Sequence, residues 1–223
     1  MDNSVDMFHA GESSQDLAEV AWADRQLNPY RLAAIDEFAG ESMLDVGCGN
    51  GAYVLALKDR LRTFGVDINR YSAWEQAEDH FDTCDATNLP VADKSFDTVT
   101  SFEVLEHVPD PVATLKEFRR VARTNIILTV PNCDLPASLK QSRLTFFHYT
   151  DSSHVNFFTE SKIRLTCEDT GLAVREIRKI NPCNMSHVVA DLFGVSSSLS
   201  KKILQRLFKK KFCMSLLAVL EVT

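Results

Sequence analysis

The sequence predicts an α/β fold in which helices cover both faces of a parallel sheet. Three observations support this prediction. Between residues 42 and 130, short apolar segments alternate with segments of helical spacing, as they do in βαβ units. A glycine-rich turn follows the first apolar segment. The segment 125–130, with the sequence NIILTV, is typical of a buried strand and is followed by Pro131.

The elements up to Pro131 are assigned in chain order. Leu27, Leu32, Ile35 and Phe38 have the spacing of a helix, which Gly40 ends. Strands are expected at residues 42–45, 63–67, 81–85, 96–102 and 125–130. Helices are expected at residues 52–59 and 112–123.

The alternation of strands and helices is less regular after Pro131. Residues 132–153 read as a loop rich in aromatic and hydroxyl side chains. A helix is expected at residues 159–170, begun by a capping Thr159 and ended by Gly171. Residues 172–180 and 212–222 read as two further strands. At 223 residues, the chain is expected to form one domain, with a helical cap (1–39), a core (40–181 and 212–223) and an insertion (182–211).

The composition is that of an ordinary globular protein and excludes several classes. The 24 basic and 31 acidic residues give a net charge of −7, so no global field draws the chain to nucleic acid. The six cysteines form no CxxC pair, which is typical of reduced thiols. No apolar run is long enough to cross a bilayer, and the acidic start does not resemble a signal peptide. A cytoplasmic location is therefore expected.

The segment 44–51, LDVGCGNG, is the clearest functional motif. Glycines let the backbone turn tightly and approach a ligand, and the helix that follows presents free N–H groups. The spacing also fits the G-x-G-x-x-G/A pattern of NAD and FAD sites. Asp67 suits a ribose in either case, and Asp85 could accept from an adenine amino group. Asp45 favours S-adenosylmethionine (SAM), which carries an ammonium group that NAD lacks.

The segments LDVGCGNGAYV, GVDIN, CDATNLPVADKSFDTV and EVLEHVPDP together resemble the class I SAM-dependent methyltransferases, in their type 11-like branch. The resemblance is close over residues 42–132. It implies a three-layer, Rossmann-like α/β/α fold whose seven-stranded, mostly parallel sheet ends in an antiparallel strand at 212–222. It also implies cofactor contacts, to the methionine portion from Asp45, Gly47, Gly49 and Gly51, to ribose from Asp67 and to adenine from Asp85. Cys48, Ile68, Ala86 and Glu103 complete the expected cofactor site.

A possible metal site follows the fourth strand. If residues 103–107 begin a helical turn, Glu103, Glu106 and His107 share one face, and His154 is the best fourth ligand, with His148 as the alternative. Such a set suits a divalent ion such as Mg²⁺ or Mn²⁺. The arrangement resembles ubiquinone-pathway O-methyltransferases and small-RNA 3′-end 2′-O-methyltransferases. Without a metal, His107 is a candidate general base, and Glu103 is the other candidate catalytic residue.

The methyl acceptor is expected to be a hydroxyl of a small-molecule, lipid-linked or glycan substrate, because the Asn/Asp-Pro-Pro-Tyr motif of N-methyltransferases is absent. An RNA 2′-O-methyltransferase and a non-enzymatic SAM-binding scaffold or sensor are the alternatives. Residues 201–211 form a basic amphipathic segment that reads as a cap helix or as a contact with an anionic membrane surface, RNA or a phosphorylated acceptor. The sequence leaves the oligomeric state open.

Overall fold

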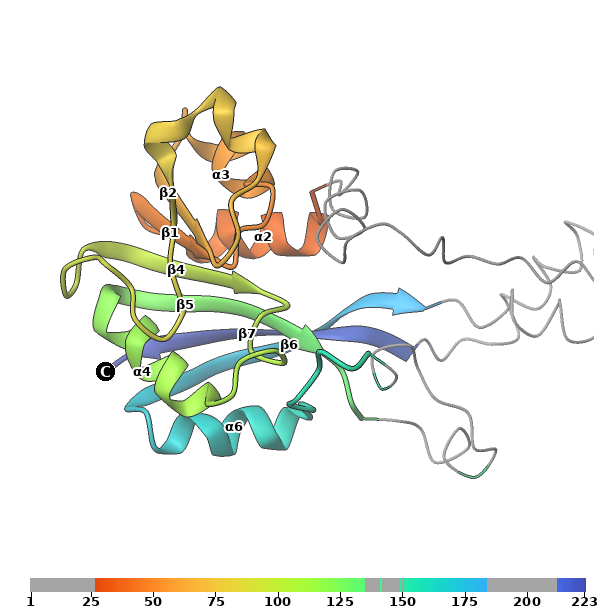
Figure 1. Ribbon diagram of the computed structural model, residues 1–223. Coiled ribbons are helices and arrows are strands. Elements are labelled where there is room, and N and C mark those ends of the chain that lie inside the picture. Colours follow the sequence, from red (N-terminus) through yellow and green to blue (C-terminus); the bar gives the residue numbers. More distant parts are fainter. Residues whose placement is uncertain (1–26, 135–140, 142–148, 150, 184–211) are drawn as a thin grey trace, which may run out of the picture.

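The computed structural model describes residues 27–134, 141, 149, 151–183 and 212–223 of the chain (Figure 1). A seven-stranded sheet forms its centre, with the strand order β3-β2-β1-β4-β5-β7-β6. The strands are β1 (Ser42–Val46), β2 (Arg62–Asp67), β3 (Phe81–Thr83), β4 (Phe96–Phe102), β5 (Ala122–Pro131), β6 (Leu172–Cys183) and β7 (Phe212–Val222). Neighbours are parallel from β3 to β5, and β7 runs antiparallel to both β5 and β6. The mostly parallel, seven-stranded sheet is therefore confirmed.

Helices cover both faces of this sheet, as predicted. Two of them, α2 (Pro29–Phe38) and α3 (Ala52–Leu57), lie on one face, and α4 (Pro111–Val121) and α6 (Glu160–Glu168) lie on the other (Figure 1). Two short 3₁₀ helices, η1 (Ser72–Gln76) and η2 (Glu78–His80), connect β2 to β3. The three layers of the predicted architecture are thus present.

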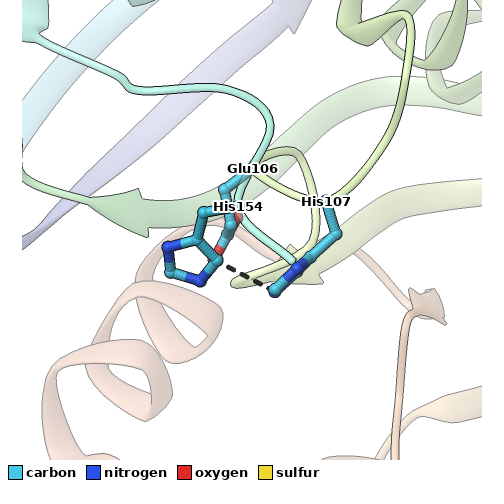
Figure 2. Close-up of side chains that lie close together, drawn as sticks. All are labelled: Glu106, His107 and His154. Carbon is cyan, nitrogen blue, oxygen red and sulfur yellow. Dashed lines mark ion pairs between the residues drawn. The ribbon is translucent and has the colours of Figure 1, made fainter. Parts of the chain in front are cut away.

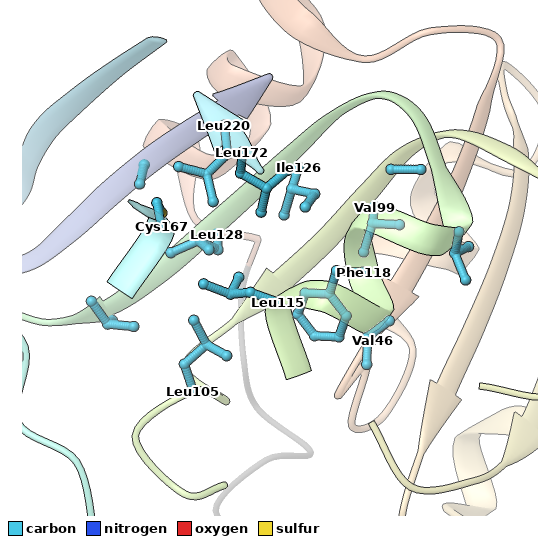
Figure 3. Close-up of a cluster of buried hydrophobic side chains, with 14 of the residues drawn as sticks. Val46, Val99, Leu105, Leu115, Phe118, Ile126, Leu128, Cys167, Leu172 and Leu220 are labelled. Carbon is cyan, nitrogen blue, oxygen red and sulfur yellow. The ribbon is translucent and has the colours of Figure 1, made fainter. Parts of the chain in front are cut away.

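The alternation of side chains along β5 explains why both faces are apolar. Ile126 and Leu128 pack into the larger core together with Leu115 and Phe118 of α4 (Figure 3). Ile127 points the other way and packs with the helix α2. All three strand residues are at most 1% exposed, because a strand between two helical layers buries both of its faces.

Capping side chains set where the helices begin. Asn28 accepts hydrogen bonds from the backbone N–H groups of Tyr30 and Arg31, so α2 begins at Pro29 rather than at Leu27. Thr159 accepts from the N–H of Lys162 and caps α6, as predicted.

Three strands differ from their predicted bounds by more than one residue. β3 ends at Thr83, so Asp85 lies in the following turn and not at a strand end. β5 ends at Pro131, which pairs with Ser215 of β7, but it begins at Ala122, three residues before its predicted start. β6 continues beyond residue 180 to Cys183, because β7 supplies pairing partners as far as Phe212. The first two residues of the predicted insertion, 182 and 183, therefore belong to this strand. Long-range pairing extends β5 and β6 beyond what the local sequence indicates.

Several predicted segments lie outside the described residues. These are most of the N-terminal cap, His148, and nearly all of the 182–211 insertion with its basic segment 201–211. In the part of the chain that the structure describes, no helix is long and apolar enough to cross a membrane. The cysteines described there with their side chains are all free thiols: Cys48, Cys84, Cys133, Cys167 and Cys213.

Candidate functional site

The glycine turn lies between β1 and α3, at the point where the strand order reverses between β1 and β4. Gly47 has a φ of +74°, and a Cβ added there would collide with the side chain of Val104. Gly49 has a φ of +53°, but a Cβ there would meet nothing within 4 Å. The turn therefore needs Gly47 for packing, whereas Gly49 faces open space where a ligand can approach.

The carboxylate of Asp67 at the end of β2 holds this turn in place. Its Oδ2 accepts a hydrogen bond of 2.8 Å from the N–H of Gly49, and its Oδ1 accepts one from Asn69. Burial raises the pKa of Asp67 above its usual range, although these backbone hydrogen bonds oppose the shift. Each carboxylate oxygen retains a lone pair for a further donor, such as a hydroxyl group.

A cavity of about 310 Å³ opens beside these residues. Its volume is at the lower end of the range usual for small-molecule sites. Eight residues of the predicted site line it: Gly47, Gly49, Asp67, Ile68, Asp85, Ala86, Glu103 and His107. Asp85 is exposed at the rim, where hydrogen bonds from the backbone and side chain of Thr87 lower its pKa.

A smaller cavity adjoins the first on the α2 side and shares Gly47, Gly49 and Phe102 with it. Asp45, Cys48 and Arg31 also line it. Gly51 lines neither cavity, because it is buried at the start of α3.

Asp45 is 2% exposed, and its Oδ1 accepts a 2.7 Å hydrogen bond from the hydroxyl of Thr100. Burial raises the pKa of Asp45 to about 7, against the lowering effects of Thr100 and of the Arg31 charge.

Arg31 is a site residue that sequence reasoning missed. Its Nη2 donates to the Oε1 of Glu103 at 2.8 Å, and its guanidinium lies 5.0 Å from the centre of the Phe102 ring. The buried Nε of Arg31 has no hydrogen-bond partner. One signal was available, because Arg31 shares the buried face of α2 with Ala34 and Ile35 at helical spacing. A charged residue on an apolar face indicates a buried partner or a ligand.

Glu103 does not begin a helical turn, contrary to the prediction. Its φ is +59°, a left-handed conformation that only a few per cent of non-glycine residues adopt. Its N–H donates to the carbonyl of Thr129, which ties the residue to β5, and residues 105–107 form a turn. This geometry turns the Glu103 side chain towards Arg31. Strained backbone of this kind is characteristic of functional sites.

Glu106, His107 and His154 nevertheless come together (Figure 2). One nitrogen or oxygen atom from each lies within 4.8 Å of the others. The loop 151–158 brings His154 there, since the N–H groups of Val155 and Asn156 donate to the carbonyl of Glu106. Glu103 is not part of this group, so the structure assembles three of the four predicted metal ligands and pairs the fourth with an arginine.

Glu106 is 1% exposed, and its Oε2 has no hydrogen-bond partner. Burial and the neighbouring charge of Glu103 raise the pKa of Glu106 to about 9.

The environment of His107 fixes which of its nitrogens is available. Its Nδ1 lies 3.2 Å from the carbonyl oxygen of Ser153, which can only accept, so Nδ1 carries the hydrogen. Burial lowers the pKa of His107, which keeps the ring neutral near pH 7. The unprotonated Nε2 faces Glu106 at 3.9 Å from its Oε1 and can bind a metal ion or accept a proton.

The sheet order, the glycine turn after β1 and the acidic residues after the next strands define a class I SAM-dependent methyltransferase. Comparison with known proteins agrees with this assignment. A family model described as "Methyltransferase domain" matches residues 21–177, and the chain belongs to this family.

The relatives in this family include O-methyltransferases. The ubiquinone biosynthesis O-methyltransferase of Pseudomonas entomophila is 33% identical over 141 residues, which is 50% of this chain and 60% of that protein. The 27-O-demethylrifamycin SV methyltransferase of Amycolatopsis mediterranei is 30% identical over 129 residues, covering 52% of this chain and 47% of that protein. The chain spans about half the length of the curated relatives it matches.

A solved structure shares the fold over nearly the whole chain. The SAM-dependent methyltransferase from Archaeoglobus fulgidus superposes with a TM-score of 0.61, at 20% identity, over 93% of this chain and 94% of that chain. This likeness concerns the fold and says nothing of the acceptor.

Proposed function

We propose that this chain transfers a methyl group from SAM to a hydroxyl oxygen of a small-molecule, lipid-linked or glycan acceptor. The observation that carries the proposal is the position of the neutral His107, which lines the cofactor cavity and directs an unprotonated Nε2 towards Glu106. Two relatives whose names specify oxygen chemistry support this choice of acceptor atom.

The side chains around the two cavities suit the parts of SAM. Asp67 would accept from the ribose hydroxyls, and the turn of Asp85 and Ala86 would border the adenine. In the smaller cavity, Asp45 would pair with the ammonium group. Arg31 would meet the carboxylate through its unpartnered Nε. The cofactor supplies an electrophilic methyl group on a sulfonium centre.

The protein has two tasks in such a transfer: it must hold the acceptor in line with the methyl group, and it must accept the hydroxyl proton. The Nε2 of His107 is suited to the second task, because its Nδ1 is already bonded to the Ser153 carbonyl. The fold of the 151–158 loop against Glu106 keeps this orientation.

A divalent ion such as Mg²⁺ or Mn²⁺ gives a second mechanism for this site, which would replace proton transfer to His107. The Nε2 of His107 can bind an ion or accept a proton, but it cannot do both. The residues fit a divalent ion, since Glu106, His107 and His154 form a mixed oxygen and nitrogen set and the Oε2 of Glu106 is buried without a partner. Glu106 and the two histidines would hold the ion, and the Oδ2 of Asp151 is a further carboxylate oxygen nearby, 3.6 Å from the Nε2 of His154. The ion would polarise the acceptor hydroxyl and make its proton easier to lose.

The same donor set favours one other acceptor, the 2′-hydroxyl of RNA. The net charge of −7 argues against it. A gel shift with short RNA at several salt concentrations separates the two, because contacts to phosphates give a steep salt dependence. The proposed membrane contact of residues 201–211 lies outside the described residues and stays a prediction.

The test is production of S-adenosylhomocysteine (SAH) from SAM with a panel of hydroxylated acceptors, followed by mass spectrometry of the product. His107→Gln should reduce turnover at least about a hundredfold, the usual contribution of a general base. His80→Gln, which alters a histidine bonded to the Thr63 carbonyl instead, is the matched control. Tight SAM binding without turnover on any acceptor would favour a SAM-binding scaffold and contradict the proposal.

A further inference from the structure

One ion pair joins the two halves of the site. Arg31 lines the smaller cavity and Glu103 lines the larger one, and they meet at 2.8 Å. Their side chains are only 10% and 19% exposed, so solvent screens the pair poorly. The pair therefore lies between the place of a cofactor carboxylate and the group formed by Glu106, His107 and His154.

The charge of Arg31 acts on both sides. It lowers the pKa of Asp45, which lines the smaller cavity, and it also lowers the pKa of Glu106, which lies beside the two histidines. In both cases burial raises the pKa by more. Glu103 also reaches Glu106, since its carboxylate raises the pKa of Glu106 both by its charge and by accepting a hydrogen bond from the protonated Glu106. Glu103 thus has two competing partners, the guanidinium on one side and the Glu106 group on the other.

We propose that Arg31 couples the two sites, so that the cofactor carboxylate and a divalent cation bind cooperatively. The inference rests on the cofactor contacts and the cation site proposed above. A carboxylate that binds the guanidinium of Arg31 neutralises it and loosens its hold on Glu103. The carboxylate of Glu103 can then turn its charge towards a cation bound by Glu106, His107 and His154. By linkage, the cation must tighten cofactor binding by the same factor.

The backbone restricts how Glu103 can respond. Its left-handed conformation is held by the hydrogen bond to Thr129, so the side chain can shift between its partners while the backbone stays in place. Arg31 is fixed in turn by α2 and by the Phe102 ring. A change of partner by one side chain is therefore enough to transmit the effect.

The coupling is tested by calorimetric titration of the full chain with Mn²⁺ under three conditions: alone, with saturating SAH, and with saturating 5′-methylthioadenosine. The last compound shares the adenosine and thioether of SAH but lacks its amino and carboxylate groups. SAH should tighten Mn²⁺ binding on the order of tenfold, within the usual range of coupling between sites. Methylthioadenosine should leave it unchanged, and Mn²⁺ should tighten SAH by the same factor.

Two variants locate the effect. Arg31→Gln should bind Mn²⁺ tightly without SAH, and SAH should no longer change that affinity. Glu103→Gln should abolish the coupling while leaving Arg31 in place, which provides an answer if the first variant folds poorly. Arg60→Gln, which removes an exposed pair with Asp36, is the matched control and should keep the full coupling.

The outcomes separate the two proposals. Equal Mn²⁺ affinity with and without SAH overturns the coupling but leaves the cation site standing. An equal gain from methylthioadenosine also overturns the coupling, because that compound has no carboxylate for Arg31. No Mn²⁺ binding under any condition overturns both the coupling and the cation site, and SAH binding measured alone still tests the cofactor contacts.

Discussion

Lowering the pH from 7.5 to 5.5 should weaken the binding of SAH strongly, because Asp45 loses its charge in this range. Burial raises the pKa of Asp45 to about 7, well above its ordinary value of 3.8. A neutral carboxyl group cannot form an ion pair with the ammonium of the cofactor. The smaller cavity offers Arg31 as a partner for the carboxylate, and among the described residues that line it Asp45 is the only acidic one.

The size of the effect follows from the pKa. A group with a pKa of about 7 is about 3% ionised at pH 5.5 and about 75% ionised at pH 7.5. If the acid form binds no cofactor, the affinity changes about 25-fold, which corresponds to about 2 kcal/mol.

Calorimetric titration with SAH across this pH range measures the effect. Methylthioadenosine is the control ligand, because it keeps the ribose hydroxyls that would meet Asp67 but has no ammonium group. This control matters since burial also raises the pKa of Asp67. Asp45→Asn should bind SAH more weakly and with little dependence on pH. An equal pH dependence for both ligands, or an unchanged one in Asp45→Asn, would refute the reasoning.

The raised pKa of Asp45 also predicts how the stability of the ligand-free protein depends on pH. A carboxyl group whose pKa is raised on folding adds stability in its acid form, and this stability is lost as the pH rises from about 4 to about 7. A rise from 3.8 to about 7 corresponds to about 4 kcal/mol of stability lost at pH 8. Asp45→Asn should therefore stabilise the ligand-free protein at pH 8 by a few kcal/mol, and far less at pH 4, in urea unfolding. A change of the same size at both pH values would contradict this.

Three further predictions concern the scaffold, and equilibrium unfolding in urea tests each of them. Phe118→Ala should lower the free energy of unfolding by about 3–5 kcal/mol, because the ring is fully buried. Its control is Leu165→Ala, which should change the free energy of unfolding by less than about 0.5 kcal/mol because Leu165 is 64% exposed. Thr159→Ala should cost about 1 kcal/mol through loss of the α6 cap, and a cost near zero would show that the cap is dispensable. Gly47→Ala should cost more than about 1 kcal/mol, from its positive φ and the collision with Val104, and a stable variant with unchanged SAH affinity would contradict the packing described.

The local sequence was sufficient to predict those parts of the fold and the site in which one physical requirement dominates. Residues 125–130 read as a buried strand because every position is apolar or can be satisfied within the sheet, and they lie in β5. The glycine turn was found because only glycine tolerates the conformation and the close approach of Val104 at Gly47. Such requirements are visible at single positions and do not depend on distant partners.

The remainder of the site depends on contacts between segments far apart in the sequence. Arg31 meets Glu103 across 72 residues, and nothing next to either residue indicates the pairing. The expectation that Glu103 lies on a helical face with Glu106 was wrong because the chain leaves β4 through a left-handed residue tied to Thr129. His154 was identified correctly as a neighbour of His107, from the resemblance of the pattern and not from spacing.

The arrangement of charge connects stability with function. Asp45 and Glu106 are almost fully buried, and each has its pKa raised mainly by burial, so each destabilises the ligand-free fold when ionised. Arg31 offsets part of this effect on both, yet the Oε2 of Glu106 and the Nε of Arg31 remain without partners. Apolar residues of similar size would give a more stable protein. The buried carboxyl groups make sense if cations arrive with the reaction: an ammonium for Asp45 and, in our proposal, a divalent ion for Glu106. On this reasoning, variants that neutralise these groups should gain stability and lose ligand affinity together.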